Sequence, residues 1–219
     1  MYKYLSGILF FLIVSTTSFA QNKPFWNEIL EFRKKDSLQM PPSGGVVFVG
    51  SSSFRMWKDA EKQFSAYKVI NRGFGGSNLV QANMYIKELV IQYKPAQVVI
   101  YSGENDIAEG ASALETASRF ATFFTNIRNQ LPESNIVFVS IKSSPSRLKH
   151  KQTFDHANLL IKDFLKYYTN TTFIDIDTKM KTRDGQLRPE LFLQDMLHMK
   201  PEGYEIWTKA ITPYLLKNK

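Results

Sequence analysis

Short apolar runs alternate with longer amphipathic segments along most of the chain. Each run is continuous in its apolar character and rich in β-branched residues, which is typical of strands that are buried on both faces. The segments between the runs repeat apolar residues at helical spacing. The predicted strands cover residues 46–49, 68–71, 97–101, 135–141 and 172–176, and the predicted helices cover residues 24–38, 78–92, 111–130, 153–168 and 201–216.

This order of strands and helices indicates the fold class. Strands that alternate with helices form parallel pairs with right-handed crossovers, which place the helices against the faces of the sheet. We therefore predict an α/β protein, a three-layer α/β/α sandwich around a mainly parallel five-stranded sheet. The sequence contains no internal repeat and no low-complexity linker, so a single domain is expected.

The first residues of the chain have the pattern of a signal peptide. Lys3 supplies a positive charge, residues 7–14 are apolar, and residues 18–20 end in small side chains. The apolar stretch is short for a membrane span, and an uncleaved anchor is the alternative interpretation. The chain has no cysteine, so we expect neither disulfides nor a lipid anchor. The sequence predicts a signal peptide at residues 1–20 and an exported domain at residues 21–219, periplasmic or secreted and without stable membrane insertion after cleavage.

Composition narrows the possible partners. Hydrophobic residues make up 43% of the chain and charged residues 22%, which is typical of a globular protein. The formal net charge of +8 favours anionic surfaces. The basic residues are scattered, however, and form no stripe with interleaved aromatic residues, so no nucleic-acid partner is expected.

Three polar, glycine-rich segments follow predicted strands, at residues 50–53, 73–77 and 103–106. Open parallel sheets bind their ligands at the carboxyl ends of the strands, where these segments are expected to lie. Ser52 would begin a helix, exposed to a substrate and close to backbone N–H groups that stabilise an oxyanion. The alternative is that the serines of this segment only cap the helix.

The second and third segments supply further hydrogen-bond donors. Gly75 and Gly76 allow the backbone to approach a ligand closely, and the side-chain amide of Asn105 can donate to an oxyanion. Each also has a simpler interpretation, with the glycines as a plain turn and Asn105 or Asp106 as a helix cap. The presence of all three segments together favours chemistry at this edge of the sheet.

A carboxylate and an imidazole occur together near the C-terminus, at Asp195 and His198. The three-residue spacing places both side chains on the same side of a turn, where the carboxylate can hold the imidazole in one tautomer. Asp177 follows a predicted strand and is the competing carboxylate for this role.

In chain order, segments 47–53, 71–77, 103–106 and 195–198 resemble the SGNH hydrolases, a branch of the GDSL esterases and lipases. The similarity extends from about residue 46 to the C-terminus. It implies the flavodoxin-like SGNH hydrolase fold, an acyl-enzyme mechanism, and neither a metal nor an organic cofactor.

The resemblance also implies individual roles. Ser52 would be the nucleophile, His198 its base and Asp195 the residue that orients His198. The backbone N–H groups of Ser52 and Gly76 and the side chain of Asn105 would form the oxyanion hole.

The sequence departs from the family pattern at one position, since Ser51 stands where the family usually has Asp. That residue is not a member of the triad, so the chemistry should survive, but the rigidity of the loop is in question. Two further points stay open: whether Gly75 or Gly76 is the oxyanion donor, and whether Arg55 and Trp57 line the cleft or pack on the first helix.

Other functional classes fit the sequence less well. The Gly-x-Ser-x-Gly elbow of α/β-hydrolases, the His-Glu-x-x-His zinc motif and the glycine spacing with lysine of a P-loop are all missing. A carbohydrate-binding module on the same scaffold is the non-enzyme alternative.

We expect removal of short acyl groups such as acetyl from carbohydrate or cell-wall esters, because the loops are too short to form an apolar lid. A lysophospholipase or short-chain acyl-phospholipid hydrolase, which the basic surface would suit, is the alternative.

Overall fold

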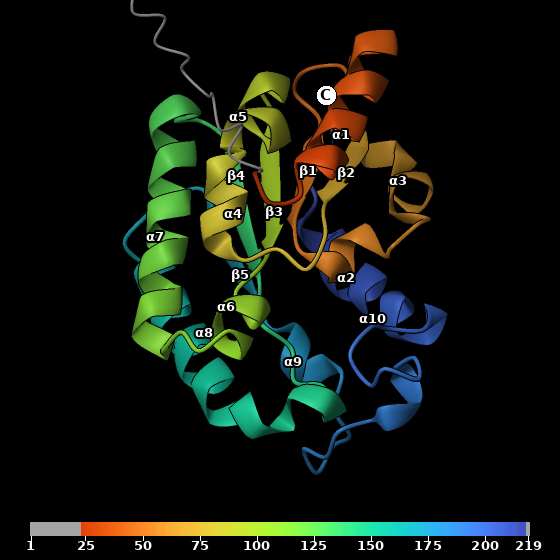
Figure 1. Cartoon of the computed structure of the whole chain (residues 1–219), viewed down its shortest axis with the longest axis vertical. Coiled ribbons are helices and arrows are strands. Elements are labelled where there is room, and N and C mark those ends of the chain that lie inside the picture. Colours follow the sequence, from red (N-terminus) through yellow and green to blue (C-terminus); the bar gives the residue numbers. More distant parts are fainter. Residues whose placement is uncertain (1–22, 218–219) are drawn as a thin grey trace, which may run out of the picture.

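The computed structural model describes residues 23–217, which fold around a five-stranded sheet (Figure 1). The strand order is β2-β1-β3-β4-β5, and neighbouring strands pair in parallel. This is the flavodoxin-like order, and helices cover both faces, so the predicted three-layer α/β/α fold is confirmed. The strands are β1 (Val46–Gly50), β2 (Val69–Gly73), β3 (Gln97–Tyr101), β4 (Asn135–Val139) and β5 (Thr171–Ile174).

Two apolar clusters attach the helices to opposite faces of the sheet. In Figure 1, α7 and α8 lie on one side of the sheet, and α3 and α10 lie on the other. The first cluster includes residues of α1 (Trp26–Leu38), α4 (Leu79–Met84), α5 (Ile86–Leu89), α7 (Ala113–Gln130) and α8 (Lys151–Leu165). The second includes residues of α2 (Ser52–Arg55), α3 (Ala60–Gln63), α9 (Ile176–Lys179) and α10 (Pro201–Ile211).

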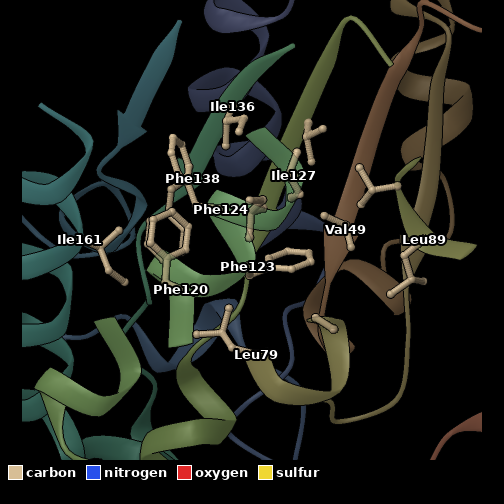
Figure 2. Packing of buried hydrophobic residues seen from close by; sticks show 14 of the residues in the cluster. Val49, Leu79, Leu89, Phe120, Phe123, Phe124, Ile127, Ile136, Phe138 and Ile161 are labelled. Atoms are coloured by element: carbon tan, nitrogen blue, oxygen red, sulfur yellow. The ribbon is translucent and has the colours of Figure 1, made fainter. Parts of the chain in front are cut away.

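Aromatic side chains fill both clusters. On the α7 side, Phe120 packs edge-on against Phe138 of β4, with ring centroids 4.7 Å apart, and Figure 2 shows this pair beside Phe124. On the opposite side, Phe54 packs against Trp207 of α10 at 5.9 Å. Such pairs stabilise the core beyond the area they bury, and they hold α2 and α10 firmly on the sheet.

Strand positions agree with the sequence expectations, but several ends differ. The second strand starts at Val69 because Lys68 adopts a left-handed conformation, with φ 50°. The fourth ends at Val139, and its predicted extension to residue 141 is wrong. There the hydroxyl of Ser140 accepts hydrogen bonds from the backbone N–H groups of Ile176 and Asp177. The fifth strand likewise ends early because residue 176 starts α9.

The predicted helix 78–92 is broken into α4, α5 and the 3-10 turn η2 (Ile91–Tyr93). The break falls at Tyr85, whose φ of −109° leaves the helical range. The ring of Tyr85 is buried, and its hydroxyl donates to the carbonyl of Pro24 at 2.5 Å. Tertiary packing of this aromatic residue therefore accompanies the break in the local helical pattern.

The remaining elements are short. They are η1 (Ser65–Tyr67), α6 (Glu104–Ala108), η3 (Pro145–His150), η4 (Pro189–Leu191) and η5 (Thr212–Tyr214). The expected signal peptide, residues 1–20, lies outside the described residues, and the domain boundary at residue 21 stays a prediction. Within residues 23–217, no helix has both the length and the apolar character needed to cross a membrane.

Candidate active site

The carboxyl ends of β1, β2 and β3 bring the three glycine-rich segments together. The N–H of Ser51 donates to the carbonyl of Tyr101 (3.1 Å), and the N–H of Phe74 donates to the carbonyl of Gly50 (3.0 Å). Gly50 is required here, since a Cβ at this position would lie 1.9 Å from the Tyr101 oxygen. The helices that follow β1 and β3 pack on opposite faces of the sheet, and α/β sheets bind their ligands at such a switch point.

Ser52 is the first residue of α2, and its Oγ lies 2.8 Å from Nε2 of His198. Ser51 occupies the N-cap position in an extended conformation, but its side chain makes no capping hydrogen bond. Ser51 and Ser53 are buried, whereas Ser52 is only half-buried. Of the three consecutive serines, the middle one therefore presents its hydroxyl to an imidazole.

His198 and Asp195 lie on a tight loop that precedes α10. The loop is closed by an antiparallel bridge between Phe192 and Met199 and by a hydrogen bond from the N–H of Leu193 to the carbonyl of His198 (2.8 Å). Within it, His198 Nδ1 lies 2.5 Å from Oδ2 of Asp195. The expected carboxylate–imidazole pair is thus assembled by local geometry.

Three hydrogen bonds determine the state of Asp195. Its Oδ1 accepts from the backbone N–H groups of Leu197 (3.0 Å) and His198 (2.9 Å), and its Oδ2 faces the imidazole. Partial burial acts to raise the pKa of Asp195, but these hydrogen bonds outweigh it and hold the pKa below its usual range. A charged carboxylate only accepts hydrogen bonds, so Nδ1 carries the ring proton and Nε2 is free to accept from Ser52.

The two oxyanion candidates on other loops lie close to each other. Gly76 is exposed, and a Cβ placed on it would lie 3.8 Å from Nδ2 of Asn105. Nδ2 also donates to the carbonyl of Ser77 (3.0 Å), which fixes the direction of the amide. The backbone N–H of Gly75 is occupied, because it donates to Glu28 (3.0 Å). Within residues 23–217, the N–H of Gly76 has no hydrogen-bond partner, so it is the N–H of the glycine pair that stays available to a ligand.

Asp177 does not contact the imidazole. It accepts a hydrogen bond from the backbone N–H of Ser143 (2.5 Å) and pairs with Lys181. Trp57 is buried in the aromatic cluster beside α10, whereas Arg55 forms an ion pair with Glu28 of α1 (3.1 Å). Of the two alternatives for Arg55, the structure shows the contact with the first helix.

Sequence reasoning missed a buried charged network directly below these loops. Lys142 is fully buried and forms an ion pair with Glu104 (3.1 Å), the residue next to Asn105. The hydroxyl of Tyr101 donates to the same carboxylate (2.6 Å). Burial, together with the Glu104 carboxylate, raises the pKa of Tyr101 well above its usual value, so this donor keeps its proton. A lysine directly after an apolar strand was the available signal, but its partner lies far away in sequence.

Comparison with known proteins places this fold and these residues in a known family. The model of the GDSL-like lipase/acylhydrolase family matches residues 45–206. This match covers most of the sequence and includes every candidate residue discussed above. The chain therefore belongs to the GDSL-like lipase/acylhydrolase family, and it is a hydrolase. A comparison with curated proteins gives no match.

Solved structures show the same fold at low sequence identity. A GDSL-like lipase from Bacteroides thetaiotaomicron VPI-5482 is 23% identical, with a TM-score of 0.73 over 85% of this chain and 96% of that one. A catalytic mutant of Axe2, an acetylxylan esterase from Geobacillus stearothermophilus, is 15% identical, with a TM-score of 0.65 over 81% of this chain and 96% of that one.

Proposed function

We propose that the protein is a serine ester hydrolase in which Ser52 is the nucleophile and His198 the general base. The observation that carries the proposal is a continuous chain of hydrogen bonds. Ser52 Oγ lies 2.8 Å from Nε2 of His198, and Nδ1 of the same ring lies 2.5 Å from Asp195. These distances are within the range required for proton transfer between a nucleophile and its base.

The reaction follows from this order of groups. Ser52 attacks the ester carbonyl carbon and passes its proton to His198, while the carbonyl electrons move to the oxygen. The adduct collapses, the bond to the alcohol breaks, and His198 returns the proton to the leaving oxygen. Water then attacks the acyl-enzyme by the same route and releases the carboxylic acid and free Ser52. Asp195 orients His198 and stabilises the imidazolium throughout.

Three donors would bind the oxyanion of the tetrahedral adduct. They are the backbone N–H groups of Ser52 and Gly76 and the side-chain amide of Asn105. As the first residue of α2, Ser52 has no intrahelical acceptor for its N–H. The exposure of Gly76 and its closeness to the Asn105 amide support a shared binding point. Each donor of this type contributes roughly 10²–10³ in rate.

The substrate we propose is a short acyl ester, such as acetyl, on a carbohydrate or cell-wall polymer. A hollow of 260 Å³ borders α2 at Arg55, and a second of 310 Å³ borders the residues that follow α2. Neither is lined by Ser52 or His198, so neither provides a pocket for a long acyl chain at the nucleophile. The similarity to an acetylxylan esterase points to the same class of ester. The ion pair of Arg55 with Glu28 counts against a phospholipid, because it leaves this nearby cation without a free charge for a phosphate.

The first test compares hydrolysis of p-nitrophenyl acetate by residues 21–219 and by Ser52→Ala. We expect the substitution to lower kcat by about three or more orders of magnitude. Ser51→Ala is the matched control, since it removes a neighbouring hydroxyl that makes no capping hydrogen bond, and its kcat should stay close to that of the wild type. Equal background rates for wild type and Ser52→Ala would refute the proposal and favour a carbohydrate-binding module.

A second test addresses the acyl group. Esters from acetyl to decanoyl are compared at the same alcohol, followed by acetylated xylo-oligosaccharides and a lysophospholipid. Highest kcat/KM on acetyl esters is expected. A maximum on the long-chain esters, or preference for the lysophospholipid, would contradict the short-acyl assignment and leave Ser52 as nucleophile of a lipid hydrolase.

A further inference from the structure

The start of α1 presses against the glycine turn that carries the proposed oxyanion donor. Phe25 packs edge-on against Phe74, with ring centroids 5.6 Å apart. Gly75 has φ +38°, and a Cβ on it would lie 2.2 Å from the ring of Phe25. The turn is therefore shaped against α1, a helix that precedes the residues matched by the family model.

Glu28 of α1 connects this turn to the nucleophile helix. Its Oε2 accepts a hydrogen bond from the N–H of Gly75 (3.0 Å) and also lies 3.1 Å from Nε of Arg55, the last residue of α2. One carboxylate oxygen thus contacts both the second glycine-rich segment and the helix that begins with Ser52. Only the φ and ψ angles of Gly75 separate its N–H from the next peptide, so fixing the N–H of Gly75 also restricts the orientation of the N–H of Gly76.

The helix that carries Glu28 is itself fixed at two points. Near its start, the carbonyl of Pro24 accepts from the hydroxyl of Tyr85 (2.5 Å). Near its end, Asp36 forms a buried ion pair with Arg72 of β2 (2.7 Å). Because both ends are anchored to the body of the domain, the position of Glu28 is defined by more than its own contacts.

The charge of Glu28 needs a counterion at this place. A carboxylate one residue from the proposed donor Gly76 would oppose the negative charge that develops on the substrate oxygen. The guanidinium of Arg55 neutralises it at 3.1 Å. Both side chains are partly exposed, so the pair contributes little to folding stability, and its value lies in geometry and local charge.

We propose that Glu28 is a positioning residue for the oxyanion hole and that Arg55 is its counterion. Glu28 holds the Gly75 peptide so that the N–H of Gly76 faces the substrate oxygen. This inference rests on the proposed function, because it assigns a role in the hydrolytic site described above. Glu28 and Arg55 form no hydrogen bond or ion pair with Ser52 or His198, so in this proposal they act through Gly75 and through charge.

The first experiment compares Glu28→Ala, Glu28→Gln and the control Glu31→Ala. Glu31 lies one turn further along α1 and is exposed, and its side chain makes no ion pair or hydrogen bond within residues 23–217. Glu28→Ala should lower kcat on p-nitrophenyl acetate about tenfold with little change in KM, because a small displacement of a catalytic group is costly. Glu28→Gln keeps an oxygen that accepts from Gly75 and should restore kcat to within about twofold of the wild type. Glu31→Ala should have no effect.

Benzeneboronic acid supplies a readout that a purely structural role would not change. Its tetrahedral adduct with Ser52 places an oxygen at the oxyanion position, so its inhibition constant should rise about tenfold in Glu28→Ala, in parallel with the loss of kcat. The midpoint of thermal unfolding should change little, because the ion pair is partly exposed.

The charge is tested with Arg55→Met and Arg55→Met/Glu28→Gln. The single variant leaves an unneutralised carboxylate and should lose activity, more so at low than at high salt, because exposed charges are screened. The double variant removes that charge as well and should regain most of the lost kcat.

The outcomes separate this inference from the proposed function. If the wild type and Ser52→Ala hydrolyse the ester at the same rate, both the proposed function and the role of Glu28 are overturned. Normal Ser52-dependent turnover with unchanged kcat and inhibition constant in Glu28→Ala would overturn only the role of Glu28. The role of Glu28 would also be overturned if kcat fell in Glu28→Ala and stayed low in Glu28→Gln. An equal fall in Glu31→Ala would have the same meaning.

Discussion

Lys142 carries its charge inside the protein, and this makes its substitution the most informative perturbation of the fold near the site. The side chain is fully buried, with Nζ 3.1 Å and 3.3 Å from the two carboxylate oxygens of Glu104. Glu104 is itself 5% exposed. Lys142→Met keeps an apolar stem of similar length and removes the charged ammonium group with its hydrogen bonds, so it leaves the Glu104 carboxylate buried without its counterion.

The magnitude follows from that orphaned charge. Breaking a buried ion pair by removing one partner costs about 3–5 kcal/mol. The hydroxyl of Tyr101 still donates to Glu104 at 2.6 Å, which offsets part of the cost, so we expect about 3 kcal/mol. For a domain of this size, each kcal/mol lowers the thermal midpoint by roughly 2–4 °C, which gives a decrease of roughly 6–12 °C.

The assay is equilibrium unfolding in urea at neutral pH, with Lys151→Met as the matched control. Lys151 also forms an ion pair, with Asp155, but both side chains are largely exposed, so this substitution should cost less than about 1 kcal/mol. An all-apolar version, Lys142→Met with Glu104→Leu and Tyr101→Phe, should recover most of the lost stability. A cost for Lys142→Met as small as that for Lys151→Met would refute the reasoning.

Further predictions concern the two glycines, the side-chain donor and the acid of the site. Gly75→Ala should lower both stability and kcat, because the added Cβ would collide with the ring of Phe25. Gly76→Ala should fold normally, because its Cβ would contact only Asn105, at 3.8 Å. Thermal unfolding and kcat are measured for both variants. Asn105→Ala should lower kcat roughly 10²–10³-fold with little change in KM, measured on p-nitrophenyl acetate. The depressed pKa of Asp195 means that its contribution to stability is present above the pKa of an unfolded carboxyl, about 3.9, and is lost as the pH falls through the lower folded value. The difference in unfolding free energy between wild type and Asp195→Asn should therefore be complete near pH 6 and shrink as the pH falls below about 3.9, measured by urea unfolding across this range. A difference that grows toward low pH would contradict this reasoning.

The strands were the most predictable elements because their signal is local and strong. The central strand β3 has the predicted bounds, Gln97–Tyr101, and all of its residues are buried. The edge strand β2 starts one residue later than predicted, since Lys68 adopts a left-handed conformation, and it ends two residues later, at Gly73. The helix break at Tyr85 was missed because it coincides with a contact to Pro24, which is far away along the chain.

The candidate site was predictable where its parts are local. Asp195 and His198 are three residues apart, and one loop holds both, so their spacing already predicts the contact. The adjacent glycines predicted a turn. Only the hydrogen bond from the N–H of Gly75 to Glu28 distinguishes that N–H from the N–H of Gly76. Chain-local patterns thus located the glycine pair, and a contact with a distant helix occupies the N–H of Gly75.

The sequence by itself determined the alternation of buried strands and amphipathic helices, and hence the α/β fold, because hydrophobic periodicity and right-handed crossovers act within short stretches of chain. It also placed the polar residues at strand ends. Tertiary structure alone decided that Glu28 meets Gly75 and that Lys142 meets Glu104. It also brings Ser52 to His198, a contact that the family resemblance implied and that no local pattern specifies. Each of these contacts depends on how elements far apart in sequence pack on the sheet, and no local pattern specifies that packing.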